Sequence, residues 1–329
     1  MRPLIRRTEC PLYTGIGRGV LRRRPFYLTL TLPSGALGGF QEADPQAISA
    51  EIGSLSLEFT RLSQLTKDPK YFDTKQRVTD VLEKNQNRTS ISGLFPILVS
   101  PLREEFDGDP FTFGGMSDSL YEYFPKQHLL LGGLTSQYQK LYEGAIEAAQ
   151  KYLFFRPMNP QNQNILSAGT TRTSTANTIN LDPESQHLAR FAGGMVALGA
   201  QIFNRRDEVD VARKLVDGCI WAYDSMPTGI MPESFRAIPC HSDADCVWCI
   251  DRWHEAVTKQ YKSGKSPNQN VHAIIEANGL QPGFTSIKDP RYLLRYASQP
   301  RFTSATYLLF ITVPKLLNPF SSSTASLVT

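Results

Sequence analysis

A repeated pattern of paired helices constrains the fold of this chain more than any other feature. In residues 47–66, apolar side chains recur at helical spacing and place a stripe on one face: Ile52, Leu55, Phe59 and Leu62. Residues 68–84 form the next predicted helix, because Asp68 suits the N-cap and Pro69 the first helical position. The connection is only about three residues long, so we expect a helical hairpin.

The same hairpin pattern occurs twice more along the chain. Residues 117–131 and 136–155 are separated by a Gly-Gly turn, and residues 187–203 and 207–226 are separated by Asn-Arg-Arg. The alternation of apolar and polar residues that is typical of strands is sparse. The sequence therefore predicts an all-α fold, and repeated hairpins of this length suit a barrel or toroid of helix pairs.

The regular pattern stops toward both ends of the chain. Residues 1–45 are rich in Arg, Gly and Pro without a helical period, and residues 296–329 contain no acidic residue and finish in SSSTASLVT. We expect an irregular basic N-terminal segment at 1–45, a helical domain at 46–295 and an irregular Ser-rich tail at 296–329.

Positive charge is concentrated in the first 24 residues, which hold seven Arg against one Glu. Because the whole chain has a net charge of +4, the remaining residues are nearly neutral. A basic arm can bind nucleic acid, but an irregular terminus explains it more simply. We therefore expect no nucleic-acid partner.

The cysteines suggest an oxidising compartment. Three of the five lie in CHSDADCVWC, as Cys240, Cys246 and Cys249, and Asn87-Arg88-Thr89 is a glycosylation sequon. The cysteine spacing matches no common zinc pattern well, so we favour a disulfide and leave its pairing open. No apolar run approaches the roughly 18 residues of a membrane span, and Arg and Gly interrupt every candidate signal-peptide core.

Residues 117–131 also place two carboxylates among aromatic side chains. Asp118 and Glu122 are four residues apart, so they share one helical face, where like charges repel. The surrounding residues include Tyr121, Tyr123 and Phe124. A functional pair is possible, although the residues alone favour an exposed acidic face.

Six sequence blocks between Ile48 and Arg295 resemble a known family: EIGSLSLEFTRLSQLTKDPKYFD, GGMSDSLYEYFPKQHLLLGG, HLARFAGGMVALGAQIFNR, DGCIWAY, TGIMPESF and GFTSIKDPRYLLR. In this order they resemble the class I α-1,2-mannosidases, glycoside hydrolase family 47, of filamentous-fungal type. The resemblance implies an (α/α)7 barrel, of which residues 46–295 would form a partial catalytic domain. It also implies inverting removal of α-1,2-linked mannose from N-glycans, with a Ca2+ ion in the site.

The resemblance assigns roles to five residues. Asp118 would be one of three catalytic carboxylates, and Glu122 would line the sugar pocket. Glu58 and Glu233 would hold the substrate or the metal's waters, and His187 would belong to the pocket wall. The residues alone leave other interpretations open. Glu58 could occupy an exposed position, Glu233 could begin a helix after Pro232, and His187 could have a structural role.

The chain departs from the family pattern in its catalytic motifs and in one disulfide. We find no motif like FExxIRxLGG, which carries the family's general acid, and YLLR continues into YASQPRF rather than PExxES. The calcium-binding Thr of a TEAH-like motif has no counterpart, and Arg190 stands where the family has the Cys that pairs with Cys219.

We therefore expect an α-1,2-mannosidase homologue that is inactive as given. A non-catalytic protein that binds mannose glycans and an unstable product of a faulty gene model are the alternatives. By resemblance, the chain would act as a monomer on high-mannose N-glycans in the secretory pathway.

Overall fold

The structure is a computed structural model, and it describes residues 43–174, 178–227, 229–242, 244–261 and 267–288. The segments predicted to be irregular, 1–45 and 296–329, lie outside the described residues except for residues 43–45. In the described segments, no helix combines the length and the apolar character needed to cross a membrane.

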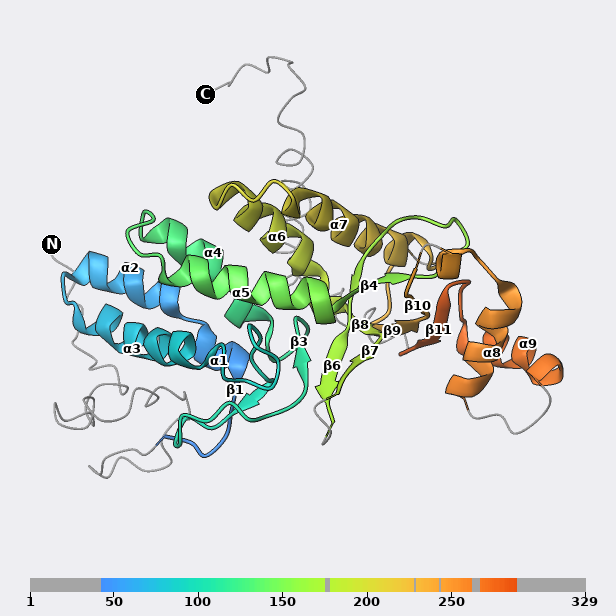
Figure 1. The fold of residues 1–329 in the computed structure, drawn as a ribbon, viewed down its shortest axis with the longest axis horizontal. Helices are drawn as coiled ribbons and strands as arrows, with labels where there is room; N and C mark the ends of the chain where they lie inside the picture. The colour runs from blue at the N-terminus through green and yellow to red at the C-terminus, as the bar shows by residue number, and fades with distance from the viewer. Residues whose placement is uncertain (1–42, 175–177, 228, 243, 262–266, 289–329) are drawn as a thin grey trace, which may run out of the picture.

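Helices dominate the structure (Figure 1). The α-helices are α1 (Ser49–Gly53), α2 (Ser56–Thr66), α3 (Lys70–Asn85), α4 (Asp118–Leu130), α5 (Gln137–Tyr152), α6 (Phe191–Ile202), α7 (Glu208–Asp224), α8 (Ile250–Gln260) and α9 (Pro267–Asn278), with 3-10 helices η1 (His187–Arg190) and η2 (Ala244–Cys246). The three predicted hairpins are confirmed, because α2 packs on α3, α4 on α5 and α6 on α7. A fourth pair, α8 and α9, extends the same arrangement.

Most of the short strands lie between the helical hairpins and α8 (Figure 1). They are β1 (Ala47–Ile48), β2 (Leu98–Val99), β3 (Phe111–Thr112), β4 (Phe154–Pro157), β5 (Ser167–Ala168), β6 (Thr170–Thr173), β7 (Ile179–Asp182), β8 (Glu184–Gln186), β9 (Ser234–Ala237), β10 (Pro239–Cys240) and β11 (Phe284–Ile287). Their antiparallel sheets have the orders β1-β2, β10-β4-β5, β11-β9-β8 and β3-β6-β7. No sheet of the described residues exceeds three strands, so the helices determine the architecture.

The first predicted helix is broken into α1 and α2. A Cβ atom on Gly53 would lie 2.2 Å from Cδ1 of Leu120, so only glycine allows α1 to approach α4 this closely. Leu55 then adopts a left-handed conformation, with φ of 67°, before α2 begins. The break interrupts the predicted apolar stripe, and Leu62 at its far end is 39% exposed.

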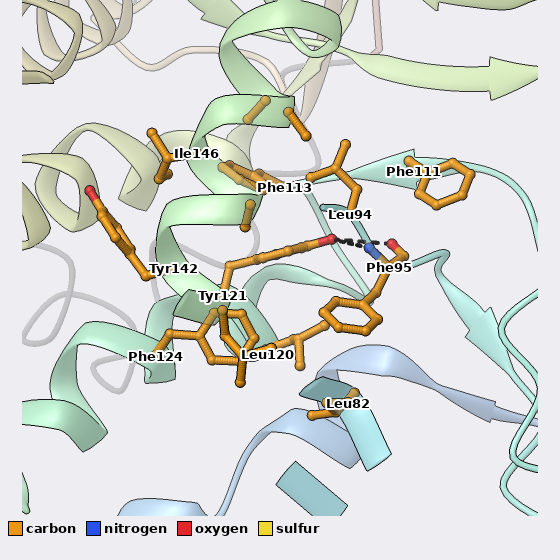
Figure 2. Packing of buried hydrophobic residues seen from close by; sticks show 14 of the residues in the cluster. Leu82, Leu94, Phe95, Phe111, Phe113, Leu120, Tyr121, Phe124, Tyr142 and Ile146 are labelled. Atoms are coloured by element: carbon orange, nitrogen blue, oxygen red, sulfur yellow. Dashed lines mark hydrogen bonds between the residues drawn. The ribbon is translucent and has the colours of Figure 1, made fainter. Parts of the chain in front are cut away.

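The core centres on Tyr121 of α4. Its hydroxyl accepts the backbone N–H of Phe95 at 2.8 Å and donates to the backbone oxygen of Phe95 at 3.2 Å, as the dashed lines in Figure 2 show. Its ring packs against Phe113, with 4.4 Å between the ring centroids. Because α4 also contacts α1, α2, α5 and α6, this side chain joins the loop after α3 to the centre of the helical assembly.

Removing the Tyr121 hydroxyl should destabilise the protein, because it leaves the buried backbone groups of Phe95 without a partner. We expect Tyr121→Phe to lower the free energy of unfolding by about 1–3 kcal/mol in urea denaturation. Tyr138→Phe is the matched control, since its partner Thr79 also donates to the Lys75 backbone oxygen. A loss for Tyr121→Phe no larger than the control's would contradict the assigned role.

Candidate functional site

Asp118 is the first residue of α4, and the segment before it is held by α1. Ser117 and Ser49 share a hydrogen bond of 2.9 Å between their hydroxyls, and the Ala50 N–H donates to the Met116 oxygen at 3.0 Å. The Asp118 side chain is half-buried, and its Oδ1 accepts the Ser119 N–H at 2.9 Å. Burial raises the pKa of Asp118, and the charge of Glu122 raises it further.

Glu122 of α4 and Glu58 of α2 both lie close enough to Tyr123 for their charges to raise its pKa. Glu122 forms an ion pair with Lys126 at 2.5 Å, one turn further along α4. The Tyr123 hydroxyl donates to Oε1 of Glu58 at 2.9 Å, and burial together with this bond raises the pKa of Tyr123 to about 12. Glu58 itself is exposed. Glu122 therefore lies near both Asp118 and Tyr123, and Tyr123 links α4 to Glu58 of α2.

A buried lysine behind this group was not singled out from the sequence. Lys75 is 4% exposed, and its Nζ donates to the Ile52 oxygen at 2.8 Å. Burial lowers the pKa of Lys75 to about 8, although the charge of Glu58 opposes this shift. Its helical spacing could have indicated the burial, because Lys75 lies on the same buried face of α3 as Val78 and Leu82.

His187 and Glu233 form a second group. The backbone N–H of His187 donates to the backbone oxygen of Glu233 at 2.7 Å, and the imidazole Nε2 of His187 lies 2.6 Å from the Tyr223 hydroxyl. Burial lowers the pKa of His187 to about 4, and the charge of Arg190 contributes, so the imidazole is neutral at pH 7. The Glu233 side chain is exposed.

One contact ties the second group to the loop before Asp118. The Gly115 N–H donates to Oε1 of Gln186 at 2.9 Å, and Gln186 directly precedes His187. In the described part of the chain, no hydrogen bond or ion pair joins the side chains of Asp118, Glu122 and Glu58 to those of His187 and Glu233. The five predicted residues thus form two groups connected through Gln186.

Arg190 lies beside the Cys219 thiol. Its Nη1 donates to the Gly218 oxygen at 3.4 Å, while Nε and Nη2 are buried without a hydrogen-bond partner among the described residues. Its guanidinium stands 5.5 Å from the ring centroid of Phe235. Burial raises the pKa of Cys219, and the nearby positive charge of Arg190 opposes that shift. Cys219 is therefore a free thiol beside an incompletely paired guanidinium.

The cysteine cluster contains the predicted disulfide, which joins Cys240 to Cys246. Cys249 is free and exposed. Across the described ranges, no group of three or more His, Cys, Asp or Glu side chains is placed to hold a metal ion. The calcium ion that the resemblance implied stays a prediction for this chain.

Comparison with known proteins identifies similar chains. The family description "Glycosyl hydrolase family 47" matches residues 26–311. A probable mannosyl-oligosaccharide alpha-1,2-mannosidase 1B of Aspergillus fumigatus is 35% identical over 188 residues, which cover 56% of this chain and 37% of that protein. Human mannosyl-oligosaccharide 1,2-alpha-mannosidase IC is 30% identical over 200 residues, which cover 60% of this chain and 30% of that protein.

Among solved structures, the alpha-1,2-mannosidase from Trichoderma reesei matches with a TM-score of 0.56 and 22% identity, over 76% of this chain and 55% of that chain. At this identity the likeness concerns the fold, which is that of an α/α barrel. The chain spans about a third of the length of the curated relatives it matches, with 37% and 30% of the two proteins covered.

The raised pKa of Asp118 makes a prediction about pH and stability. At pH values below 3.8, the ordinary pKa of an Asp, the Asp118 carboxyl is protonated in both the folded and the unfolded protein. At higher pH the unfolded chain loses this proton before the folded protein does, which lowers the free energy of unfolding. Asp118→Asn should therefore have a higher melting temperature than the parent at pH 7, and the gain should vanish by about pH 3. An equal difference at both pH values would contradict the assigned pKa shift.

The position of Arg190 beside Cys219 predicts that a disulfide can form there. Arg190→Cys should stabilise the fold by roughly 3–4 kcal/mol under oxidising conditions, the chain-entropy value for a loop of about 30 residues. The measurement is the melting temperature with and without reductant. Arg190→Ser is the matched control, and an equal gain in that variant would mean that removing the unpaired guanidinium, rather than forming a bond, stabilises the fold.

Proposed function

The chain belongs to glycosyl hydrolase family 47, and on that basis we propose that it is an α-1,2-mannosidase homologue that recognises terminal α-1,2-linked mannose of high-mannose N-glycans. Residues 46–295 would form part of the catalytic domain. The observation that carries the proposal is the proximity of Asp118 and Glu122 on α4, with Tyr123 linking this helix to Glu58 of α2.

The chemistry of these side chains suits a sugar. A mannose unit presents a ring of hydroxyl groups, and ionised carboxylates accept hydrogen bonds from hydroxyls. Glu58 is exposed, and Glu122 and Asp118 are half-buried, so the three carboxylates differ in their access to solvent. His187 is neutral at pH 7, because its pKa is about 4, and its imidazole can join the same kind of hydrogen bonding. Glu233, which directly precedes β9, would accept hydrogen bonds from the sugar hydroxyls in the same way.

Within this group, Asp118 is the residue best suited to move a proton. Proton transfer is most efficient when the pKa of the group lies near the working pH, and burial shifts Asp118 in that direction. An inverting glycosidase also needs a second carboxyl group, about 6.5 to 9.5 Å from the first. The two neighbouring candidates already have partners, because Glu122 forms an ion pair with Lys126 and Glu58 accepts a hydrogen bond from Tyr123. We therefore assign neither of them the role of the second catalytic carboxyl group.

The sequence contains neither the motif that carries the family's general acid nor the PExxES motif. The proposal is therefore that this chain binds mannose and does not hydrolyse it at a measurable rate.

We also propose that the protein works in the secretory pathway. The disulfide between Cys240 and Cys246 supports this location, because such bonds persist in oxidising compartments. The sequon at Asn87 agrees with it, since the Asn87 side chain is exposed and accessible to a glycan-transferring enzyme.

Binding to an array of high-mannose glycans tests the recognition site. Glu122→Gln should weaken binding by about tenfold or more, because it removes a charged acceptor of sugar hydroxyls. Asp210→Asn is the matched control, since Asp210 and Lys214 form the same four-residue ion pair on α7 as Glu122 and Lys126 on α4. Equal binding by the Glu122 variant and the parent would remove α4 from the site.

Release of mannose from α-1,2-mannobiose tests the absence of turnover. We expect no release above the background of an Asp118→Asn variant, because a missing general acid or base alone reduces the rate by about 10²- to 10⁴-fold. Turnover that Asp118→Asn abolishes would show that other acids of this chain supply the missing groups, and would overturn this part of the proposal.

A further inference from the structure

A pocket of about 350 Å3 lies beside α8, away from the residues discussed so far. Its walls come from the loop after β4, the C-terminal end of α7, the segment between η2 and α8, α8 itself and the loop before β11. Figure 1 shows these segments meeting at the end of the molecule that carries α8 and α9. The volume falls within the usual range for small-ligand sites, which is about 300–1,000 Å3.

Two tryptophans line this pocket. The rings of Trp248 and Trp253 are 5.6 Å apart between centroids and inclined at 42°, so they form an angled aromatic corner. Trp253 is 4% exposed, and its indole N–H donates to the Phe284 oxygen at 2.9 Å, which fixes its ring. Trp248 is half-buried and presents the more accessible surface.

The segment that carries Trp248 is held in place by covalent and polar contacts. The disulfide between Cys240 and Cys246 closes a short loop directly before it. From α8, the Arg252 Nη1 donates to the Asp245 oxygen at 2.8 Å. Because both contacts restrain the backbone before Trp248, the aromatic corner is formed without a ligand.

The polar residues of the pocket are all uncharged. Gln161, Gln281 and Ser225 contribute amide and hydroxyl groups to its walls. Ile250, which is 53% exposed, adds apolar surface. No Asp, Glu, Lys or Arg is among the described residues that line it. The pocket therefore offers aromatic faces together with neutral hydrogen-bonding groups.

We propose that this pocket binds one neutral pyranose unit of a glycan, as a second sugar site separate from the site at α4. A pyranose has an apolar C–H face that packs on an indole ring, and hydroxyl groups that pair with amide and hydroxyl side chains. Its neutrality matches a pocket without charged walls. The pocket shares no residue with Asp118, Glu122, Glu58, His187 or Glu233.

Tryptophan fluorescence provides a direct test, because the chain has three tryptophans and two of them line the pocket. Titration with methyl α-D-mannopyranoside should change the emission saturably, with a dissociation constant on the order of a millimolar for one sugar ring. The Glu122→Gln variant should show the same titration, which separates this pocket from the site at α4. Saturation-transfer NMR of the methyl glycoside gives a second readout that does not depend on tryptophan.

Variants decide whether the pocket is responsible. Trp248→Ala should weaken sugar binding by about tenfold or more, as expected on truncating an aromatic anchor, and Gln161→Ala should weaken it less. Leu134→Ala, at an exposed position between α4 and α5, is the control that should bind as the parent does. Thermal melting verifies that each variant is folded.

Three results would overturn the proposal: no saturable signal from either readout, binding by folded Trp248→Ala and Gln161→Ala that equals the parent's, or binding of a proline-rich peptide in place of the sugar. The last result would assign the aromatic corner to a protein partner.

Discussion

The close contact between α1 and α4 is the constraint on which the rest of the structure depends. It requires a glycine at position 53, because Leu120 fills the space that any side chain would occupy. The same helix α4 presents Tyr121 to the backbone of Phe95, and it begins at Asp118, directly after Ser117, which is hydrogen-bonded to Ser49. The packing of one helix therefore stabilises the core and orients the candidate catalytic carboxylate.

Charged groups inside this fold are compensated to very different degrees. Glu208 is fully buried, yet it receives the Tyr142 hydroxyl at 2.9 Å and an ion pair with Arg205 at 2.6 Å. By contrast, among the residues that the structure describes, Lys75 Nζ has only the Ile52 oxygen as a hydrogen-bond acceptor, at 2.8 Å, and two nitrogens of Arg190 lack partners. An incompletely paired buried charge is costly. Both of these residues lie beside a group of the candidate site, where strain and perturbed pKa values tend to concentrate.

Local sequence patterns predicted three of the four helical pairs among the described residues, although the first predicted helix is broken at Gly53 and the pair of α8 and α9 was not predicted. The apolar periodicity and short turns of residues 117–155 and 187–226 depend on neighbours within a few residues, and the structure confirms both hairpins. The six sequence blocks, of which the one around Asp118 is part, likewise indicated the family, and the family description that matches residues 26–311 confirms it. The roles of Asp118, Glu58, Glu122, His187 and Glu233 remain predictions, because they rest on the resemblance.

Residue periodicity could not reveal features that depend on contacts between distant segments. The pairing of β8 with β9 joins residues 184–186 to 234–236, and the break at Gly53 reflects a helix more than 60 residues away. The sequence by itself determined the helical hairpins, the family and the presence of a disulfide in the cysteine cluster. Only the tertiary structure decided which cysteines pair, that Lys75 is buried, and that Trp248 and Trp253 share a pocket, because each depends on how separate segments pack together.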